Sequence, residues 1–126
     1  MRRFLFGTAL LTILLFSGLW VSTAADRMLL PISETLQQAS RQCVSGDLAG
    51  GQALADQAKL EWDSIWNYAA VFTDHAPMDE IDSLFGQMES FRGENNAADF
   101  AACCSRLSRL VHAVAEAHSP TWWNIF

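Results

Sequence analysis

An uncharged apolar run near the N-terminus constrains this 126-residue chain more than any other feature. It extends from Phe4 to Ala25, 22 residues without a charged side chain, directly after Arg2 and Arg3. About 20 helical residues span a hydrocarbon core ~30 Å thick, so the run is long enough to cross a membrane. Basic residues ahead of such a span stay in the cytoplasm. We therefore expect a single-pass protein of the cell membrane, with residues 1–25 as anchor or signal segment and 26–126 as an extracytoplasmic helical domain.

Two fates of the apolar run remain open at this point. The small residues from Ser22 to Ala25 suit a signal-peptidase site, which indicates a cleaved secretory signal. The run is longer than the 7–15 residues usual for the apolar part of a signal, and Trp20 suits the membrane interface. These two features favour an anchor that is not cleaved.

The exported part, residues 26–126, is strongly acidic. It holds all 14 Asp and Glu residues and six of the eight Lys and Arg residues, Arg2 and Arg3 being the other two, so its formal charge is −8. Nucleic acids and anionic lipid headgroups are bound through clustered basic residues, which argues against both as partners. The charge instead keeps an alanine-rich domain soluble beside a membrane.

Four segments after the apolar run show helical periodicity, over residues 28–44, 48–73, 77–92 and about 95–118. Each carries an inward stripe at three- and four-residue spacing: Leu29, Ile32, Leu36, Ala39 and Cys43; Trp62, Ile65, Trp66, Ala69 and Phe72; Ile81, Leu84, Phe85, Met88 and Phe91; Phe100, Cys103, Leu107, Leu110, Val111 and Val114. We expect Trp66 to be a core residue packed on the third segment. The sequence therefore predicts an all-α fold, in which a transmembrane helix is followed by a small antiparallel bundle of about four helices in two hairpins.

Local residues indicate where these helices begin and end. Gly46 suits the left-handed position after a helix, and Asp47 suits the N-cap of the next one. Gly93 is expected to end the third helix, with Asn95 or Asn96 capping the fourth.

Two prolines also bear on the helix boundaries. Pro31 fits the first turn of a new helix, or a kink in a helix that runs on from the apolar span. Pro77 fits the first position of the third helix, where its missing N–H costs nothing.

The corner around Pro77 holds the groups with the most chemical potential, namely Asp74, His75, Asp79, Glu80 and Asp82. His75 with Asp79 and Asp82 could bind a metal, because imidazole and carboxylates suit zinc, manganese or iron. A corner position does not put His75 on the same helical face as Asp79, which favours a structural role. The chain has no di-iron motif, nucleophile elbow or glycine-rich phosphate loop. We therefore predict no enzymatic activity and no cofactor, with a metal site at this corner as the alternative.

Three cysteines, Cys43, Cys103 and Cys104, do not form the framework of a small secreted domain. Without a C-x-x-C pair they lack the signature of structural zinc, and they are interpreted as small apolar core residues. A disulfide from Cys43 to Cys103 or Cys104 stays open, because in an up-down bundle these residues are expected within about 5 Å of each other along the axis.

The C-terminal tail contains four large apolar residues, Trp122, Trp123, Ile125 and Phe126. One interpretation is that they fold back and seal an end of the bundle. The other is a docking surface for a partner or for the bilayer interface, where Trp is favoured.

The order of these features resembles a known family. The N-terminal anchor is followed by Trp62 and Trp66, His75, the run Asp79 to Asp82, the helix start Asn96 to Asp99 and the closing Asn124 to Phe126. In this order the chain is similar to the membrane-anchored bacterial proteins of domain of unknown function 4363. The family has no assigned catalytic residues, so the resemblance implies no site. This chain departs from the family's richness in Lys and Glu, and its cysteines belong to no family motif.

Two functions follow as hypotheses. The first is a non-enzymatic binding or scaffolding module with an unknown protein partner, held at the membrane by residues 4–25. The second is a metal-binding or metal-sensing protein that uses His75, Asp79 and Asp82.

Overall fold

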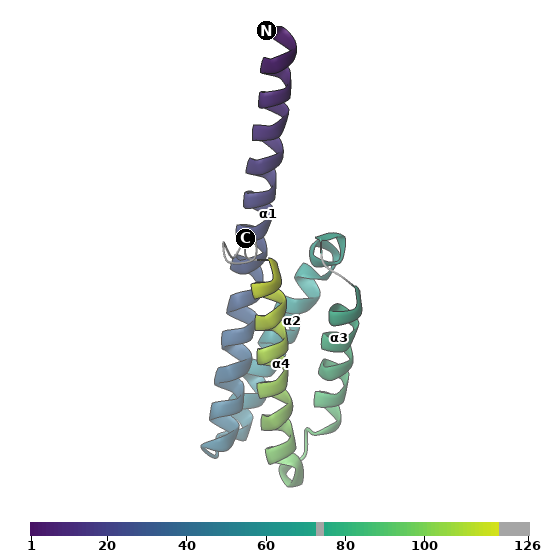
Figure 1. Cartoon of the computed structure of the whole chain (residues 1–126). Coiled ribbons are helices and arrows are strands. Elements are labelled where there is room, and N and C mark those ends of the chain that lie inside the picture. The colour runs from purple at the N-terminus through teal and green to yellow at the C-terminus, as the bar shows by residue number, and fades with distance from the viewer. Residues whose placement is uncertain (73–74, 119–126) are drawn as a thin grey trace.

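The computed structural model of the chain consists of helices, with no strand among the described residues (Figure 1). The structure describes residues 1–72 and 75–118, apart from the side chains of residues 21, 22, 25, 72 and 118. Its α-helices are α1 (Arg2–Val44), α2 (Leu48–Phe72), α3 (His75–Ser90) and α4 (Ala97–His118), and a short 3-10 helix, η1 (Glu94–Asn96), leads into α4. The all-α prediction is confirmed for this part of the chain.

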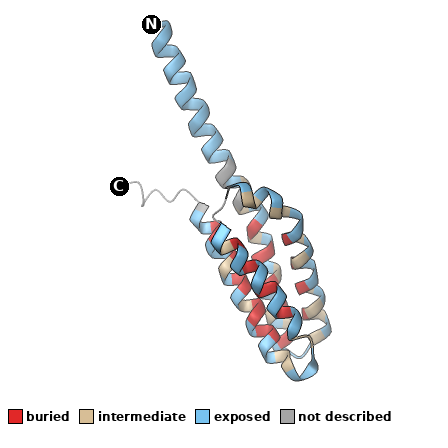
Figure 2. Cartoon of the chain, turned by 90° about the vertical axis from the view of Figure 1, so that its right-hand side faces the viewer, coloured by how far each residue is buried: buried red, intermediate tan, exposed pale blue. Residues whose placement is uncertain are grey.

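Helix α1 joins the apolar N-terminal run to the folded part of the chain without a break. It has 43 residues, and at 1.5 Å per residue it is about 65 Å long. Residues 2–20 are exposed and project alone beyond the other helices (Figure 2), whereas α1 is buried on one side from Leu29 onward. Pro31 lies inside this helix. The expectation that the helix runs on from the apolar span is confirmed, and the alternative of a new helix starting near Pro31 is wrong.

The turn between α1 and α2 follows from two residues. Gly46 has φ +100°, and its N–H donates to the carbonyl of Cys43, while the N–H of Asp47 donates to the carbonyl of Gln42. This pair of bonds is the Schellman ending of a helix. The Asp47 carboxylate then accepts from the N–H of Gly50 at 2.9 Å, which caps α2. Both local predictions for this turn are confirmed.

One hydrophobic core is shared by the four α-helices. Helix α1 packs on α4 and on α2, α4 packs also on α3, and each chain reversal makes successive helices antiparallel (Figure 1). The inward stripe of α1 is buried in full, as expected, and so are Ile81, Leu84, Phe85 and Met88 of α3. Helices α2 and α3 meet chiefly through large side chains: the ring centroids of Trp62 and Phe85 are 6.3 Å apart.

Hydroxyl groups fix the register between α1 and α4. Ser33 donates to the carbonyl of Ser108 at 2.9 Å, and Ser108 donates back to the carbonyl of Ser33 at 2.7 Å. One heptad further along α1, Ser40 donates to the carbonyl of Ala101 at 2.8 Å. Side chains this short reach a neighbouring backbone only where the two helices lie close together. The two pairs therefore define an antiparallel register that can be followed along the whole contact.

Trp66 is not the core residue that the stripe on α2 predicts. Trp62 is 0% exposed, whereas Trp66, Ile65 and Ala69 are only partly buried, and the Phe72 side chain lies outside the described residues. The end of α2 leans away from α1 (Figure 1), so its last turns have fewer neighbours than the periodicity alone implies. Trp66 instead packs edge-on against Trp62, with ring centroids 5.9 Å apart.

Both ends of α3 and the start of α4 differ from expectation by two residues, whereas α4 ends at His118 as expected. Helix α3 starts at His75, so Pro77 is its third residue, where a backbone N–H has no helical partner in any case. Gly93 is extended (φ −104°, ψ 154°) rather than left-handed, and it precedes η1 instead of ending α3. Asn95 and Asn96 lie in η1, so α4 begins at Ala97.

Candidate functional site

A groove of about 300 Å³ lies along the seam between α1 and α4. The serine contacts that bring the two helices together form its floor, and it is lined by Ser33, Gln37, Ser108, Arg109, His112, Ala113 and Glu116. These residues fall on the shared face because Ser33 and Gln37 are one turn apart on α1, as are Ser108 and His112 on α4. The groove is therefore a polar surface feature built on two closely packed helices.

The charged residues of the groove are accessible to a binding partner. His112 and Glu116 stand one turn apart, with Nδ1 and Oε1 3.6 Å from each other, and both are about half exposed or more. Arg109 is exposed and makes no ion pair within the described residues. A guanidinium, an imidazole and a carboxylate in one groove suit a polar segment with both donors and acceptors.

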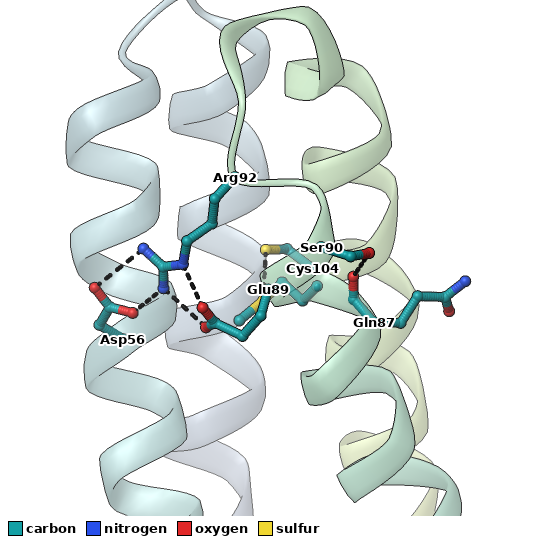
Figure 3. A network of polar contacts seen from close by, with 7 residues as sticks. Asp56, Gln87, Glu89, Ser90, Arg92 and Cys104 are labelled. Carbon is teal, nitrogen blue, oxygen red and sulfur yellow. Dashed lines mark hydrogen bonds and ion pairs between the residues drawn. The ribbon is translucent and has the colours of Figure 1, made fainter.

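A second polar cluster, centred on Arg92, has a structural role (Figure 3). Its guanidinium bonds to both carboxylate oxygens of Glu89, at 2.6 and 3.0 Å, and also to Asp56 of α2. The same group lies over the ring of Phe100, 5.9 Å from the centroid. The hydrogen bond from Arg92 lowers the pKa of Glu89. These contacts hold the α3–α4 connection against α2, which gives the cluster a structural role.

His75 begins α3, so His75, Asp79 and Asp82 follow one another at four- and three-residue spacing along this helix, contrary to the expectation that His75 lies off the face of Asp79. His75 and Asp79 are exposed at the start of α3, and the Asp82 carboxylate accepts a hydrogen bond from the Trp62 indole N–H at 3.0 Å. Asp74 lies outside the described residues. Within residues 1–72 and 75–118, no group of three or more His, Cys, Asp and Glu side chains is arranged to hold a metal ion. Metal binding at this corner stays a prediction, and no contact of the described residues favours it.

The three cysteines are free and buried, as expected for core residues. Burial raises the pKa of all three thiols, and that of Cys104, which also has Cys43 and Cys103 nearby, to about 12. A thiol protonated at neutral pH is a poor nucleophile and a poor metal ligand.

The register of α1 and α4 offsets Cys43 from Cys103 and Cys104 along the bundle axis by more than the expected 5 Å or so. Cys43 is the last residue but one of α1, and the register set by Ser33–Ser108 and Ser40–Ala101 puts Ala98 opposite it. Cys103 and Cys104 come five and six residues later, which is about 8–9 Å along the axis. A disulfide needs Cα atoms within about 7 Å, so this arrangement does not support one.

Exposed apolar side chains gather where α2 ends. Tyr68 is 65% exposed and Val71 is 75% exposed. Figure 1 shows that this end of α2, the start of α3 and the end of α4 lie at the same end of the bundle, from which the apolar part of α1 projects. The candidate surface formed by Trp122, Trp123, Ile125 and Phe126 follows α4 at this end but lies outside the described residues.

The family model described as Domain of unknown function (DUF4363) matches residues 19–125. The chain belongs to this family. The match begins within the apolar run and includes the rest of α1, so the DUF4363 unit contains the part of α1 that joins the run to the core. Comparison with curated proteins and with solved structures gives no match. The resemblance found in the sequence is confirmed at the level of the family.

The groove between α1 and α4 was not predicted from the sequence. The sequence feature that points to it is the pair Ser33 and Ser40, which are seven residues apart beside the buried stripe of α1. Helix α4 has two serines, Ser105 and Ser108, and the sequence alone does not say which of them meets Ser33. Arg109 and His112 follow Ser108 on the same face, so the groove becomes visible only once Ser33 and Ser108 are paired.

Proposed function

We propose that this DUF4363 protein is a non-enzymatic binding or scaffolding module, anchored in the cell membrane by residues 4–25 and displaying its helical domain outside the cytoplasm. The observation that carries the proposal is the continuity of α1. The segment Arg2–Trp20 is long and apolar enough to cross a membrane and is not buried by the rest of the chain. The same helix then contributes Leu29, Ile32 and Leu36 to the core.

Such a helix holds the domain in one orientation. A domain on a flexible tether would follow a linker rich in glycine, serine or proline, whereas α1 passes from the apolar segment into the core as helix. A rigid mount is useful for presenting a surface at a fixed height and angle, which is what a scaffold needs. It also reduces the orientational freedom that a partner must overcome on binding.

The surface proposed for a partner is the groove between α1 and α4. Both of its walls belong to the helices with the most extensive contact in the bundle, so it is preformed. Arg109 and His112 on one wall and Gln37 on the other suit a polar segment of a partner protein. The buried, protonated thiols offer no nucleophile, which supports a binding role over catalysis.

The first experiment tests membrane anchorage and topology. The full chain is expressed in bacterial membranes, extracted with alkaline carbonate, and treated with protease from the outer side of spheroplasts. The proposal expects the protein to stay in the membrane pellet and its helical domain to be digested from outside. Release by carbonate, or protection of the domain until the membrane is opened, would contradict it.

The second experiment tests the groove with a photoreactive amino acid. Placed at Ala113 in the groove, it should crosslink one protein reproducibly in intact cells, whereas the same group at the exposed Gln87 of α3 should not. Arg109→Glu should reduce the Ala113 crosslink at least fivefold without lowering the melting temperature. Equal crosslinking at both positions, or indifference to Arg109→Glu, would reject the groove as the binding surface.

A further inference from the structure

The polar residues of the groove between α1 and α4 follow a fixed order along its length. In the register set by the serine contacts, Gln37 of α1 is level with Cys104 of α4. Arg109 comes five residues after Cys104, and His112 and Glu116 follow Arg109 by three and seven residues. The groove therefore runs from a neutral amide, past a guanidinium, to an imidazole and a carboxylate, over about 18 Å of helix.

The two arginines of α4 have different surroundings. Arg106 forms an ion pair with Glu80 of α3 at 3.4 Å. Arg109 lines the groove, is exposed, and makes no ion pair with a described residue. The other basic side chain of the groove, His112, already has Glu116 at 3.6 Å. The Arg109 guanidinium is therefore the group of the groove that is best placed to attract an anion.

The donors for such an anion lie on the walls of the groove and not on its floor. The Ser33 hydroxyl donates to the carbonyl of Ser108, and the Ser108 hydroxyl donates to the carbonyl of Ser33, so both hydroxyl protons are already used. The exposed Arg109 and Gln37 carry N–H donors on opposite walls. A planar guanidinium can bind both oxygens of one carboxylate, which makes a carboxylate the anion that suits this site.

The carboxylate of Glu116 lies too far along the groove to exclude a second carboxylate at Arg109. The two residues are seven positions apart, which is about 10 Å along the helix, and both are exposed. At physiological ionic strength, exposed charges are screened over about 8 Å. The end of the groove at Arg109 is therefore positive, whereas the end at Glu116 is not.

We propose that the groove recognises an acidic side chain of its partner protein, with the carboxylate held between Arg109 and the Gln37 amide. The inference rests on the proposed function, because it names the chemistry that the groove of this binding module selects. A carboxylate in this position joins the partner to α1 and α4 at once. The rest of the exported domain is acidic, so an acidic segment is repelled elsewhere and is directed to this groove.

The test uses three synthetic peptides and the full chain in phosphatidylcholine nanodiscs. The peptides are acetylated and amidated, carry one diazirine side chain for photolabelling, and differ only in a central Glu, Gln or Lys. Mass spectrometry identifies and quantifies the labelled positions. Arg109→Gln and Arg106→Gln form a matched pair of variants, because each removes one exposed arginine of α4 and only the first lies in the groove.

The proposal expects the Glu peptide to label the groove about three times as strongly as the Gln and Lys peptides, a preference limited by the modest strength of exposed charge pairs. Arg109→Gln should abolish this preference, and Arg106→Gln should leave it unchanged.

Equal labelling of the groove by the Glu and Gln peptides, or a preference for Glu that persists in Arg109→Gln, overturns the carboxylate contact. Strongest labelling by the Lys peptide also overturns it and assigns recognition to Glu116. The crosslink from Ala113 in intact cells tests the proposed function separately. If that crosslink depends on Arg109 while the Glu and Gln peptides label equally, the groove remains the binding surface and only the carboxylate contact is rejected.

Discussion

At the scale of single residues, Trp62 and Trp66 stand one helical turn apart and have different environments. Trp62 is completely buried, packs against Phe85, and donates its indole N–H to Asp82. Trp66 covers one edge of Trp62 and is partly open to solvent. The periodicity of α2 identifies both as inward-facing, but only the course of α2 past α3 determines how deeply each is buried.

Truncation of the two tryptophans should therefore have unequal effects. Trp62→Ala should cost about 3–5 kcal/mol of unfolding free energy, the usual range for a fully buried large aromatic. Trp66→Ala should cost about 1–2 kcal/mol, because less apolar surface is lost. Thermal unfolding of detergent-solubilised full chain measures both. Equal destabilisation by the two variants would mean that Trp66 is buried by something outside the described contacts.

A second prediction at this scale concerns Asp82. Asp82→Ala should cost about 1–2 kcal/mol, because it leaves the buried indole N–H of Trp62 without its acceptor. Asp79→Ala, an exposed carboxylate on the same helix, serves as the matched control and should change stability by less than about 0.5 kcal/mol. Zinc or manganese should leave the melting temperature of the unaltered protein unchanged. A stoichiometric rise with metal that both variants abolish would establish the metal site instead.

At the scale of helices, close backbone approaches determine how α1, α2 and α4 pack. A Cβ placed on Gly51 of α2 would lie 2.8 Å from the carbonyl oxygen of Ala39 and would also collide with the Cys43 sulfur. Gly86 of α3 has nothing within 4 Å of the same position. The close approach of α1 to α2 therefore requires a glycine at position 51, whereas no neighbouring atom requires one at position 86.

Substitution of these glycines tests the contact between α1 and α2. Gly51→Ala should destabilise by about 1–3 kcal/mol, the usual cost of overpacking, because a backbone oxygen must move. Gly86→Ala should stabilise by up to about 1 kcal/mol through helix propensity alone. Urea unfolding of the two variants shows whether each substitution lowers or raises the unfolding free energy. A stabilising Gly51→Ala would show that α1 and α2 are further apart than described here.

The Arg92 cluster predicts a pH dependence. Arg92→Met should cost about 1 kcal/mol at pH 7, a modest value because Glu89 and Asp56 are half exposed and solvent screens the pairs. The pKa of Glu89 is lowered in the folded protein, so its contribution is present above the unfolded pKa of about 4.3 and disappears as the pH falls through the folded value. The difference in unfolding free energy between the Arg92→Met variant and the unaltered protein should accordingly shrink from pH 7 to pH 3. If this difference in unfolding free energy did not depend on pH, the lost stability would come from the packing of Arg92 on Phe100.

At the scale of the whole molecule, local chemistry was easier to anticipate than the relations between helices. The turn at Gly46 and Asp47, the buried stripe of α1 and the run-on of α1 from the apolar span depend on neighbouring residues, and the sequence predicts them. The partial exposure of Trp66 and the offset of Cys43 from Cys103 depend on the course and register of helices far apart in the chain. The groove belongs to this second class, because Ser33 and Ser108 are 75 residues apart.

The continuity of α1 is also the basis of the proposed function, since the helix connects the apolar segment to the core without a break. A flexible connection around residues 20–28 would remove the fixed orientation. The two ends of α1 carry exposed positions for probes, Thr12 in the apolar segment and Gln38 on the bundle.

The most direct measurement is a pulsed electron spin resonance distance between labels at Thr12 and Gln38 in the full chain in lipid nanodiscs. Labels introduced as noncanonical amino acids leave the three native cysteines in place. For 26 residues of unbroken helix we predict one narrow distribution centred at about 39 Å. A broad distribution, or a main peak shorter by 10 Å or more, would contradict a single rigid α1.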